Sequence, residues 1–460
     1  VRRNGAPYGR VWDPPGSRGA LCTSRGWGAR RTSPARDASG TASQAPRLNV
    51  YLFEEDYMGE CNRREITGKR ATPSRAWLIL VVLLLFSVSA PLNQFKVPPI
   101  MPLLMDALGL SMGRAGLLMS VYAVTGLLLA LPSGFILQRV GSRITGLLAG
   151  GSLVVGAALG ALSRNTGVLL ASRVIEGIGT SFMAVLAPAI IARWFARDDR
   201  GTAMGIWAAW VPVGTAAMLI LAPSVGGAWG WRAVWWLGAG YALAVTGLYL
   251  LGVGTGRSAP AAAPEARSAP AVGAAEVLRN RDIWLLAAAF GAFNAAVIGA
   301  STYLPTFLTD ERGLTLAQAS LLSSVPTLIT IFSAPGGGLV SDRIGSRKTP
   351  FLVGFALALL LLPLPAALGL SGLFVLVVVQ GIVFGLIPTN IFAAAVEAAG
   401  DEEQSGLAMA MIMVGQNGGM LLGPAVFGGF VEGVGWAGAF ASLSVMAALG
   451  LATGWLARVR

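Results

Sequence analysis

One ten-residue string occurs twice in this chain, and its repetition constrains the fold more than any other feature of the sequence. The string reads GFILQRVGSR over residues 134–143 and GLVSDRIGSR over residues 338–347, an offset of 204 positions (338 minus 134). The same offset aligns residues 104–145 with the second copy without any gap. Unrelated apolar segments share Leu and Ala by chance, but not the polar pattern Arg-x-Gly-Ser-Arg. The chain therefore contains two copies of one structural unit.

Long apolar runs flank both copies of the string. Hydrophobic residues make up 54% of the chain and charged residues only 12%, a composition typical of membrane proteins. About 20 apolar residues are enough for a helix to cross a bilayer. The sequence predicts an all-α integral membrane protein with twelve transmembrane helices in two pseudo-symmetric six-helix halves. We place these helices at about residues 76–104, 115–133, 144–162, 167–192, 202–224, 232–252, 283–308, 316–337, 349–369, 372–396, 406–428 and 436–456.

The distribution of Arg and Lys predicts the orientation and the domain boundaries. Loops rich in these residues stay on the cytoplasmic side, so we expect both termini in the cytoplasm and the protein in the cell (inner/cytoplasmic) membrane. The N-terminal half covers residues 76–252 and the C-terminal half covers residues 283–460. Between them, residues 253–282 are rich in Ala, Pro and Arg, which predicts a flexible cytoplasmic linker.

Residues 1–75 form a basic tail that we expect to be disordered, because its low apolar content cannot offset the entropy of ordering. Three interpretations of residues 1–57 compete: a transit peptide, a basic arm at the membrane surface, or sequence that is not translated. The third depends on residues 54–56, Glu-Glu-Asp, because a purine-rich run resembling a ribosome-binding site can encode them just before Met58.

Several classes of function are excluded by what the sequence lacks. The chain has no histidine, which removes histidine metal sites and histidine acid–base catalysis. The only cysteines, Cys22 and Cys61, precede the first span, so no disulfide joins the spans. No ATP-binding loop of the Gly-x4-Gly-Lys-Ser/Thr kind occurs. We therefore expect no enzyme, no metal and no cofactor. The net charge of +12 is spread over the tail and short loops, which indicates orientation in a membrane and no nucleic-acid partner.

Charged residues at membrane depth are distributed unequally between the halves. Lys96, Arg173 and Glu176 all map through the repeat offset onto uncharged residues of the second half. A helix rise of about 1.5 Å per residue places the two cations in the same half of the bilayer. Charges at this depth are costly and mark function. We predict a site for a small anion, with Glu176 and Arg173 as the coupling pair.

Further polar and aromatic residues complete the predicted site, and structural roles compete with each assignment. Arg173 and Glu176 lie on one helical face and can simply neutralise each other, Lys96 can snorkel to the interface, and the asparagines and tryptophans can serve helix packing. Replacing either cation by Gln is expected to weaken substrate binding while folded yield stays near normal. The predicted substrate-binding residues are Lys96, Arg173, Asn93, Asn294, Ser301 and Tyr303, with Trp207 and Trp210 as an apolar wall.

The repeated string resembles the loop sequence of the major facilitator superfamily, Gly-x3-Asp-Arg-x-Gly-Arg-Arg. Asp342 keeps the acid of that pattern, whereas Gln138 replaces it in the first copy. The resemblance implies two halves that rock about a central site lined by spans one, four, seven and ten. It also implies that the loops set the conformational equilibrium, through Gly134, Arg139, Gly141, Arg143, Gly338, Asp342, Arg343, Gly345 and Arg347.

The pattern around span four, together with Arg193-Trp-Phe and Gly230-Trp-Arg232, is loosely similar to the cyanate/nitroimidazole and oxalate/formate branches of that superfamily. We predict a monomeric secondary active transporter that moves a small organic or inorganic anion across the lipid bilayer, coupled to a proton or counter-ion. The alternative is proton-driven efflux of drugs or other apolar compounds. A membrane sensor is disfavoured because no soluble signalling domain is present.

Overall fold

The computed structural model describes residues 72–130, 132–253, 274–399 and 402–459. Within these ranges nearly every residue is helical and no strand occurs. The predictions for the N-terminal tail, including translation from Met58, concern residues outside the described part, apart from residues 72–75. Most of the predicted linker, residues 254–273, also lies outside it.

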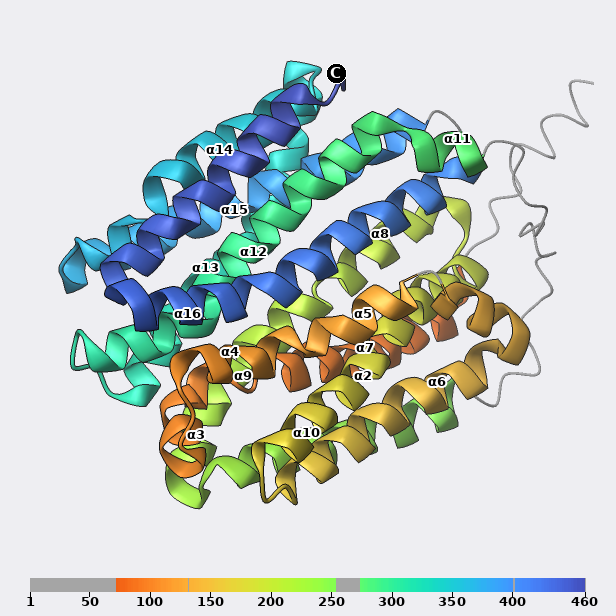
Figure 1. Ribbon diagram of the computed structural model, residues 1–460. Coiled ribbons are helices and arrows are strands. Elements are labelled where there is room, and N and C mark those ends of the chain that lie inside the picture. The colour runs from red at the N-terminus through yellow and green to blue at the C-terminus, as the bar shows by residue number, and fades with distance from the viewer. Residues whose placement is uncertain (1–71, 131, 254–273, 400–401, 460) are drawn as a thin grey trace, which may run out of the picture. The chain divides into compact units, whose positions relative to one another are not determined.

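Ten helical elements make up the N-terminal half of the described chain. They are α2 (Ser74–Gln94), the 3-10 helix η1 (Pro98–Ile100), α3 (Met101–Leu108), α4 (Met112–Ser120), α5 (Tyr122–Leu129), α6 (Pro132–Ala161), α7 (Thr166–Trp194), α8 (Arg197–Ala208), α9 (Trp210–Trp229) and α10 (Trp231–Gly252). The C-terminal half contains α11 (Ala274–Arg279), α12 (Arg281–Asp310), α13 (Leu316–Ile344), α14 (Lys348–Leu361), the 3-10 helix η2 (Leu364–Ala366), α15 (Leu370–Ala399) and α16 (Glu402–Leu456). Figure 1 shows the long helices running side by side.

Two glycines divide helices that continue through a turn. Gly141 (φ 77°, ψ 170°) interrupts α6, and Gly435 (φ 73°, ψ 179°) interrupts α16. Glycine adopts such a positive φ readily because it has no Cβ. In Figure 1 the two arms of α16 meet at a sharp bend. The described part contains eleven helices long and apolar enough to cross a membrane, and the bend divides the longest into two arms. The twelve-span, all-α membrane fold is thereby confirmed.

The first span differs from its prediction. The sequence predicts a helix over residues 76–104, but α2 ends at Gln94 and the chain continues through η1 and α3. Pro98 explains the difference, because proline lacks the N–H that would donate to the carbonyl of Gln94 and continue the helix. The early end leaves the last carbonyl groups of α2 without helical partners.

Glycine packing sets the spacing of helices within each half. A Cβ added to Gly415 or Gly419 of α16 would collide with the carbonyl oxygen of Ala287 or Gly291 on α12. The two helices therefore approach closely, as small residues permit in membrane proteins. In the N-terminal half, Gly146 of α6 lies equally close to the ring of Tyr249 on α10. Glycines in spans three and eleven therefore serve close helix packing.

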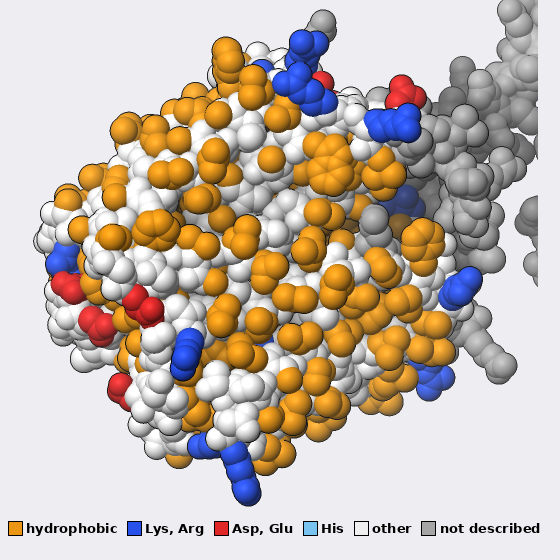
Figure 2. Space-filling view, viewed as in Figure 1, with side chains coloured by type: hydrophobic (Ala, Val, Ile, Leu, Met, Phe, Trp, Pro, Cys, Tyr) orange, Lys and Arg blue, Asp and Glu red, His pale blue; other side chains and the backbone are white. Residues whose placement is uncertain are grey.

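The surface of the described part is apolar over the region that faces the viewer in Figure 2. Hydrophobic side chains are spread across the whole of that face, and the Lys, Arg, Asp and Glu side chains lie mostly near its edges. Large apolar side chains are exposed on many different spans, with Phe332 at 81% and Leu128 at 66% of their full accessible area. A surface of this kind matches lipid and not water.

The loops fall at two ends of the helices. The end that carries the repeated strings, residues 134–143 and 338–347, is called the motif end here. There Tyr249 donates to the carbonyl of Ser142 at 2.8 Å and Lys348 to that of Ala457 at 2.6 Å. The opposite end carries the turns at Gly109, Gly230, Gly313 and Gly435, all with positive φ.

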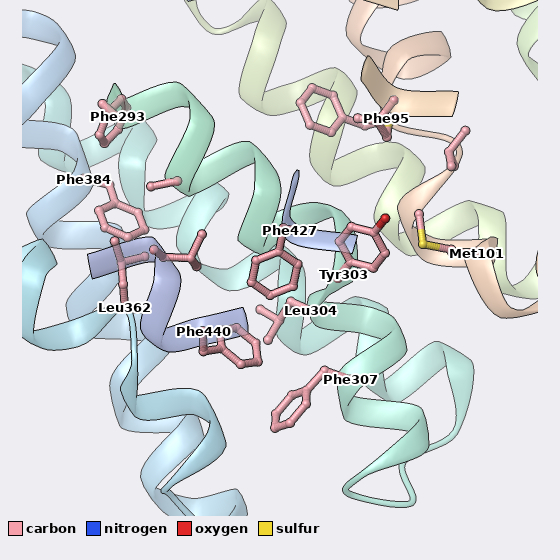
Figure 3. Close-up of a cluster of buried hydrophobic side chains, with 14 of the residues drawn as sticks. Phe95, Met101, Phe293, Tyr303, Leu304, Phe307, Leu362, Phe384, Phe427 and Phe440 are labelled. Carbon is pink, nitrogen blue, oxygen red and sulfur yellow. The ribbon is translucent and has the colours of Figure 1, made fainter. Parts of the chain in front are cut away.

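Two apolar clusters form most of the core. One lies within the N-terminal half, between α2, α6 and α10, and includes Phe86 stacked on Tyr249 with ring centroids 4.6 Å apart. The other contains residues of both halves. Figure 3 shows a part of it, in which Phe95 and Met101 of the first half lie near Tyr303 and Phe427 of the second. This second cluster joins the halves.

Candidate functional site

The candidate site begins where α2 ends. Helix α2 ends at Gln94, and Lys96 follows in the short segment before η1 with its side chain fully buried. Its ammonium group donates to Glu176 Oε1 at 2.6 Å and to Asn93 Oδ1 at 3.0 Å. The ammonium also lies 4.7 Å from the ring centroid of Trp235 on α10, a cation–π contact. Lys96 therefore does not reach the interface, and the snorkelling alternative is wrong.

The side chain of Arg173 on α7 binds the C-terminal end of α2. Its Nη1 and Nη2 atoms donate to the carbonyls of Asn93 and Gln94, each at 2.7 Å, and its Nε donates to the carbonyl of Leu118 on α4 at 3.0 Å. These two α2 carbonyls are at the helix C-terminus, where a cation is electrostatically favourable. The guanidinium also lies 4.6 Å from the ring centroid of Tyr122. Arg173 thus joins α2, α4 and α7.

Glu176 bridges the two cations. One carboxylate oxygen accepts from Lys96, and the other accepts from Arg173 Nη1 one helical turn away on α7. All three side chains have no accessible area. With all three groups ionised, the triad carries one net positive charge. The predicted Arg173–Glu176 pairing is present, but it belongs to a three-residue network that also holds Lys96.

Glycines and hydroxyls shape the surroundings of the triad. A Cβ added to Gly156 on α6 would lie 2.6 Å from Glu176 Cγ, so only glycine leaves room for the carboxylate there. Tyr122 donates to the carbonyl of Ala90 at 3.1 Å and shares a 2.6 Å hydrogen bond with Thr180. Tyr122 thus connects α5 to α2 and α7 beside the triad.

Three predicted site residues of α12 lie apart from the triad. Asn294 donates to the carbonyl of Phe290 at 2.8 Å, Ser301 is partly buried, and Tyr303 donates to the carbonyl of Met112 at 2.6 Å. Within the described ranges, no hydrogen bond connects them to Lys96, Arg173 or Glu176. Of the predicted set, the structure brings together Asn93, Lys96, Arg173 and Glu176.

The two span-five tryptophans pack against the first span. Trp207 and Trp210 are stacked with ring centroids 5.5 Å apart, and both are at least nine-tenths buried. The indole N–H of Trp207 donates to the hydroxyl of Ser87 on α2 at 3.0 Å. Their position inside the N-terminal apolar cluster is a packing arrangement.

The second copy of the repeated string forms an ion-pair network at the motif end. Arg347 contacts Asp342 at 2.5 Å and Glu397 of α15 at 2.8 Å, with all three side chains partly exposed. The hydrogen bond to Glu397, and after it the one to Asp342, raises the pKa of the Arg347 guanidinium, so this group stays charged. In the first copy, Arg139, Arg143 and Gln138 are exposed. Gln138 cannot form the corresponding ion pair.

Sequence reasoning missed three residues of these networks. Tyr122 and Trp235 place their rings against the triad cations, and Glu397 completes the loop network. A signal for Tyr122 was available, because it is a lone tyrosine in span two that the repeat maps onto Pro326. Glu397 lies 50 residues from its partner, and no local pattern connects them.

The sequence matches the family model "Major Facilitator Superfamily" over residues 78–404 and 307–460. Similar proteins include a hexuronate transporter of Bacillus subtilis, 24% identical over 392 residues that cover 81% of this chain and 92% of that protein. A nitrite extrusion protein of the same organism is 25% identical, covering 61% of this chain and 71% of that protein. An MFS-type efflux pump of Mycolicibacterium smegmatis is 26% identical, covering 65% and 70%.

The fold is also similar to that of a solved structure. A bacterial homologue of the human lysosomal transporter Spinster, in an inward-facing and unoccupied conformation, superposes with a TM-score of 0.74. The alignment covers 84% of this chain and 98% of that one at 17% sequence identity. At this identity the likeness shows a common fold.

Proposed function

Because the chain belongs to the major facilitator superfamily, we propose that it transports a small organic or inorganic anion by alternating access, with Lys96, Arg173 and Glu176 as its binding and coupling centre. The observation that carries this proposal is the buried triad with one net positive charge, which among the described residues has no equivalent in the C-terminal half. Buried charges are costly unless compensated, so a retained excess cation favours an anionic ligand.

The contacts divide the roles of the two cations. Arg173 is bonded to three backbone carbonyls and is held by the scaffold. Among the described residues, the ammonium of Lys96 donates to two side chains, those of Glu176 and Asn93, and to no backbone carbonyl. A flexible ammonium can change partners more readily than a guanidinium fixed at several points. Lys96 is therefore the group that we assign to the substrate, and Arg173 the group that positions it.

Glu176 occupies the place of an anion in the resting site. Its Oε1 lies 2.6 Å from the Lys96 ammonium, the position that a substrate carboxylate or oxyanion would take. An incoming anion has to displace this carboxylate, and protonation of Glu176 makes displacement easier because it weakens both ion pairs. The arrangement supports coupling of anion transport to a proton, with Glu176 as its carrier.

The similar proteins agree with an anionic substrate in part. Two are named for anions, hexuronate and nitrite, which supports the same chemical class for this chain. A third is named as an efflux pump, which keeps proton-driven efflux of apolar compounds as the competing function. The two functions predict different effects of removing the Lys96 charge. Binding of an anion requires this charge, whereas binding of an apolar compound does not.

The test is a binding and transport screen on purified protein. Galacturonate, nitrite and nitrate are compared with ethidium by thermal shift and by uptake into proteoliposomes. For an anion that binds the unmodified protein, Lys96→Gln should weaken binding by roughly ten- to hundredfold, since a charge-assisted hydrogen bond contributes about 1.5–3 kcal/mol and 1.4 kcal/mol is tenfold. Arg164→Gln, at an exposed position, serves as the matched control. Undiminished anion transport by Lys96→Gln, or transport of ethidium alone, would overturn the proposal.

A further inference from the structure

The two halves are bonded to each other at the end opposite the motif end. Several hydrogen bonds between described residues cross from one half to the other here. The amide of Gly113 on α4 donates to Glu432 Oε1 of α16 at 2.8 Å, and the hydroxyl of Tyr303 on α12 donates to the carbonyl of Met112 at 2.6 Å. Both bonds engage the first turn of α4. A carboxylate and a phenol of the second half thus hold one helix end of the first half.

Helix α4 relies on Glu432 for its N-terminal cap. The N-cap residue Ser111 makes no capping hydrogen bond with its own side chain, although serine commonly does so. The first amides of a helix have no partner within the helix, and a negative charge near them is favourable. Glu432 supplies that charge from the other half and also lies within the electrostatic reach of Arg114. The cap is therefore a contact between halves and not a local one.

The surrounding contact is close, and Tyr303 is fully buried in it. A Cβ added to Gly116 on α4 would collide with the hydroxyl of Tyr303, and one added to Gly428 on α16 would meet the same hydroxyl. Figure 3 shows the Tyr303 hydroxyl directed toward the segment that carries Met101, within the apolar cluster shared by both halves. Glu432 lies at the exposed margin of this contact. The apolar cluster joins the halves here, and the charged bond lies outside it.

We propose that Glu432 is a gate residue of the transport cycle: its bond to the N-terminus of α4 stabilises the state that is closed at the end opposite the motif end. Rocking of the halves separates the two partners, so the bond exists in one state of the cycle and is absent from the other. A contact present in only one state shifts the equilibrium toward that state. Glu432 thereby sets how often this end opens, whatever the substrate is.

The test measures that equilibrium without substrate, so its failure is distinct from a failure of the anion-transport proposal. Cys22 and Cys61 are replaced by Ser, and spin labels are placed at Arg164→Cys and Ala367→Cys, exposed positions at the same end in opposite halves. Pulsed electron–electron double resonance then gives the populations of short and long distances. In Glu432→Gln the ratio of long to short distances should rise about two- to fivefold, the range expected for a carboxylate at a helix N-terminus.

Two further variants separate a gate from a simple stabiliser of α4. Glu311→Gln is the matched control, because Glu311 is an exposed carboxylate of the same half and end that bonds no other described residue through its side chain. It should leave the distances unchanged. Ser111→Asp combined with Glu432→Ala restores a local cap but not the bond between halves, because alanine at 432 has no group that could bond to residue 111, so its distances should stay long. Unchanged distances in Glu432→Gln, or full recovery in the double variant, would overturn the proposal.

Discussion

The ammonium of Lys96 and the carboxylate of Glu176 lie 2.6 Å apart with neither side chain exposed, although 80 positions separate them in the chain. This ion pair connects the segment after the first span to the middle of the fourth. Because Glu176 also contacts Arg173, removing any one member changes the charge balance of the other two. The predictions for the site follow from this sharing of the Glu176 carboxylate between two cations.

Arg173 and Lys96 should differ sharply in their effect on stability. Arg173→Gln leaves three backbone carbonyls and a buried carboxylate without their donor, and loss of a buried ionic partner costs about 3–5 kcal/mol. Lys96→Gln leaves Glu176 paired with Arg173, so we expect a smaller loss of about 1–3 kcal/mol. Thermal unfolding of the purified proteins in detergent provides the comparison.

These contacts change the expectation that both variants fold with near-normal yield. We now expect that outcome for Lys96→Gln alone. Equal unfolding temperatures for the two variants would show that the carbonyl bonds of Arg173 contribute little. Arg173→Lys is a useful companion, because a lysine keeps the charge but cannot reach three carbonyls from one rigid plane. It should recover less than half of the lost stability.

A methyl group added beside Glu176 should disturb the site without touching any charge. Gly156→Ala places a Cβ 2.6 Å from Glu176 Cγ and 2.9 Å from the carbonyl oxygen of Ser172. Overpacking of this kind costs about 1–3 kcal/mol. On the same helix, Gly151 has no atom within 4 Å of an added Cβ. Gly151→Ala should therefore be neutral or slightly stabilising, as expected for alanine in a helix.

The readout for this pair is anion uptake together with the unfolding temperature. We expect Gly156→Ala to lose both and Gly151→Ala to keep both. If Gly156→Ala unfolds at the temperature of the unmodified protein and transports normally, the carboxylate can move aside freely. The tight packing of the triad would then have no role in the activity.

The loop network should affect the rate of transport and not the affinity. Asp342→Asn removes one of the two carboxylates that bind Arg347, at an exposed site where an ion pair contributes about 0–1 kcal/mol. We expect turnover to fall several-fold while the substrate concentration for half-maximal uptake stays constant. Gln138→Asn, at the equivalent position of the first copy, should leave turnover unchanged. A large loss of affinity in Asp342→Asn would contradict this prediction.

The sequence was sufficient to predict the fold because the internal repeat and the lengths of the apolar runs independently indicated the same arrangement of spans. The offset of 204 positions defined two halves, and each apolar run had the length of a span. The error at the first span had a visible cause, since Pro98 ends the helix that the apolar content would have continued. Apolar content reports burial in lipid, whereas the backbone of proline decides where a helix ends.

The sequence predicted which residues form the site better than it predicted the contacts between them. Lys96, Arg173 and Glu176 stood out as unpaired charges at membrane depth, and the structure brings them together. Their depth along separate helices could be calculated, but the rotation of each helix about its axis could not. For this reason Asn294 and Tyr303, at plausible depth on α12, form hydrogen bonds elsewhere. The carbonyl partners of Arg173 could likewise not be predicted, because every residue has a backbone carbonyl and the sequence does not distinguish which of them accept a hydrogen bond.

The end of α2 also has a consequence for biosynthesis. Its last carbonyl group, that of Gln94, accepts from a side chain made 79 residues later. The first span therefore enters the bilayer before the residue that completes its terminus exists. Until the fourth span follows, this terminus must find water or another donor, since lipid offers none. The first span therefore reaches its final structure only when the fourth span is present. In a ribosome-bound chain that stops before Arg173, the C-terminal end of the first span should remain hydrated.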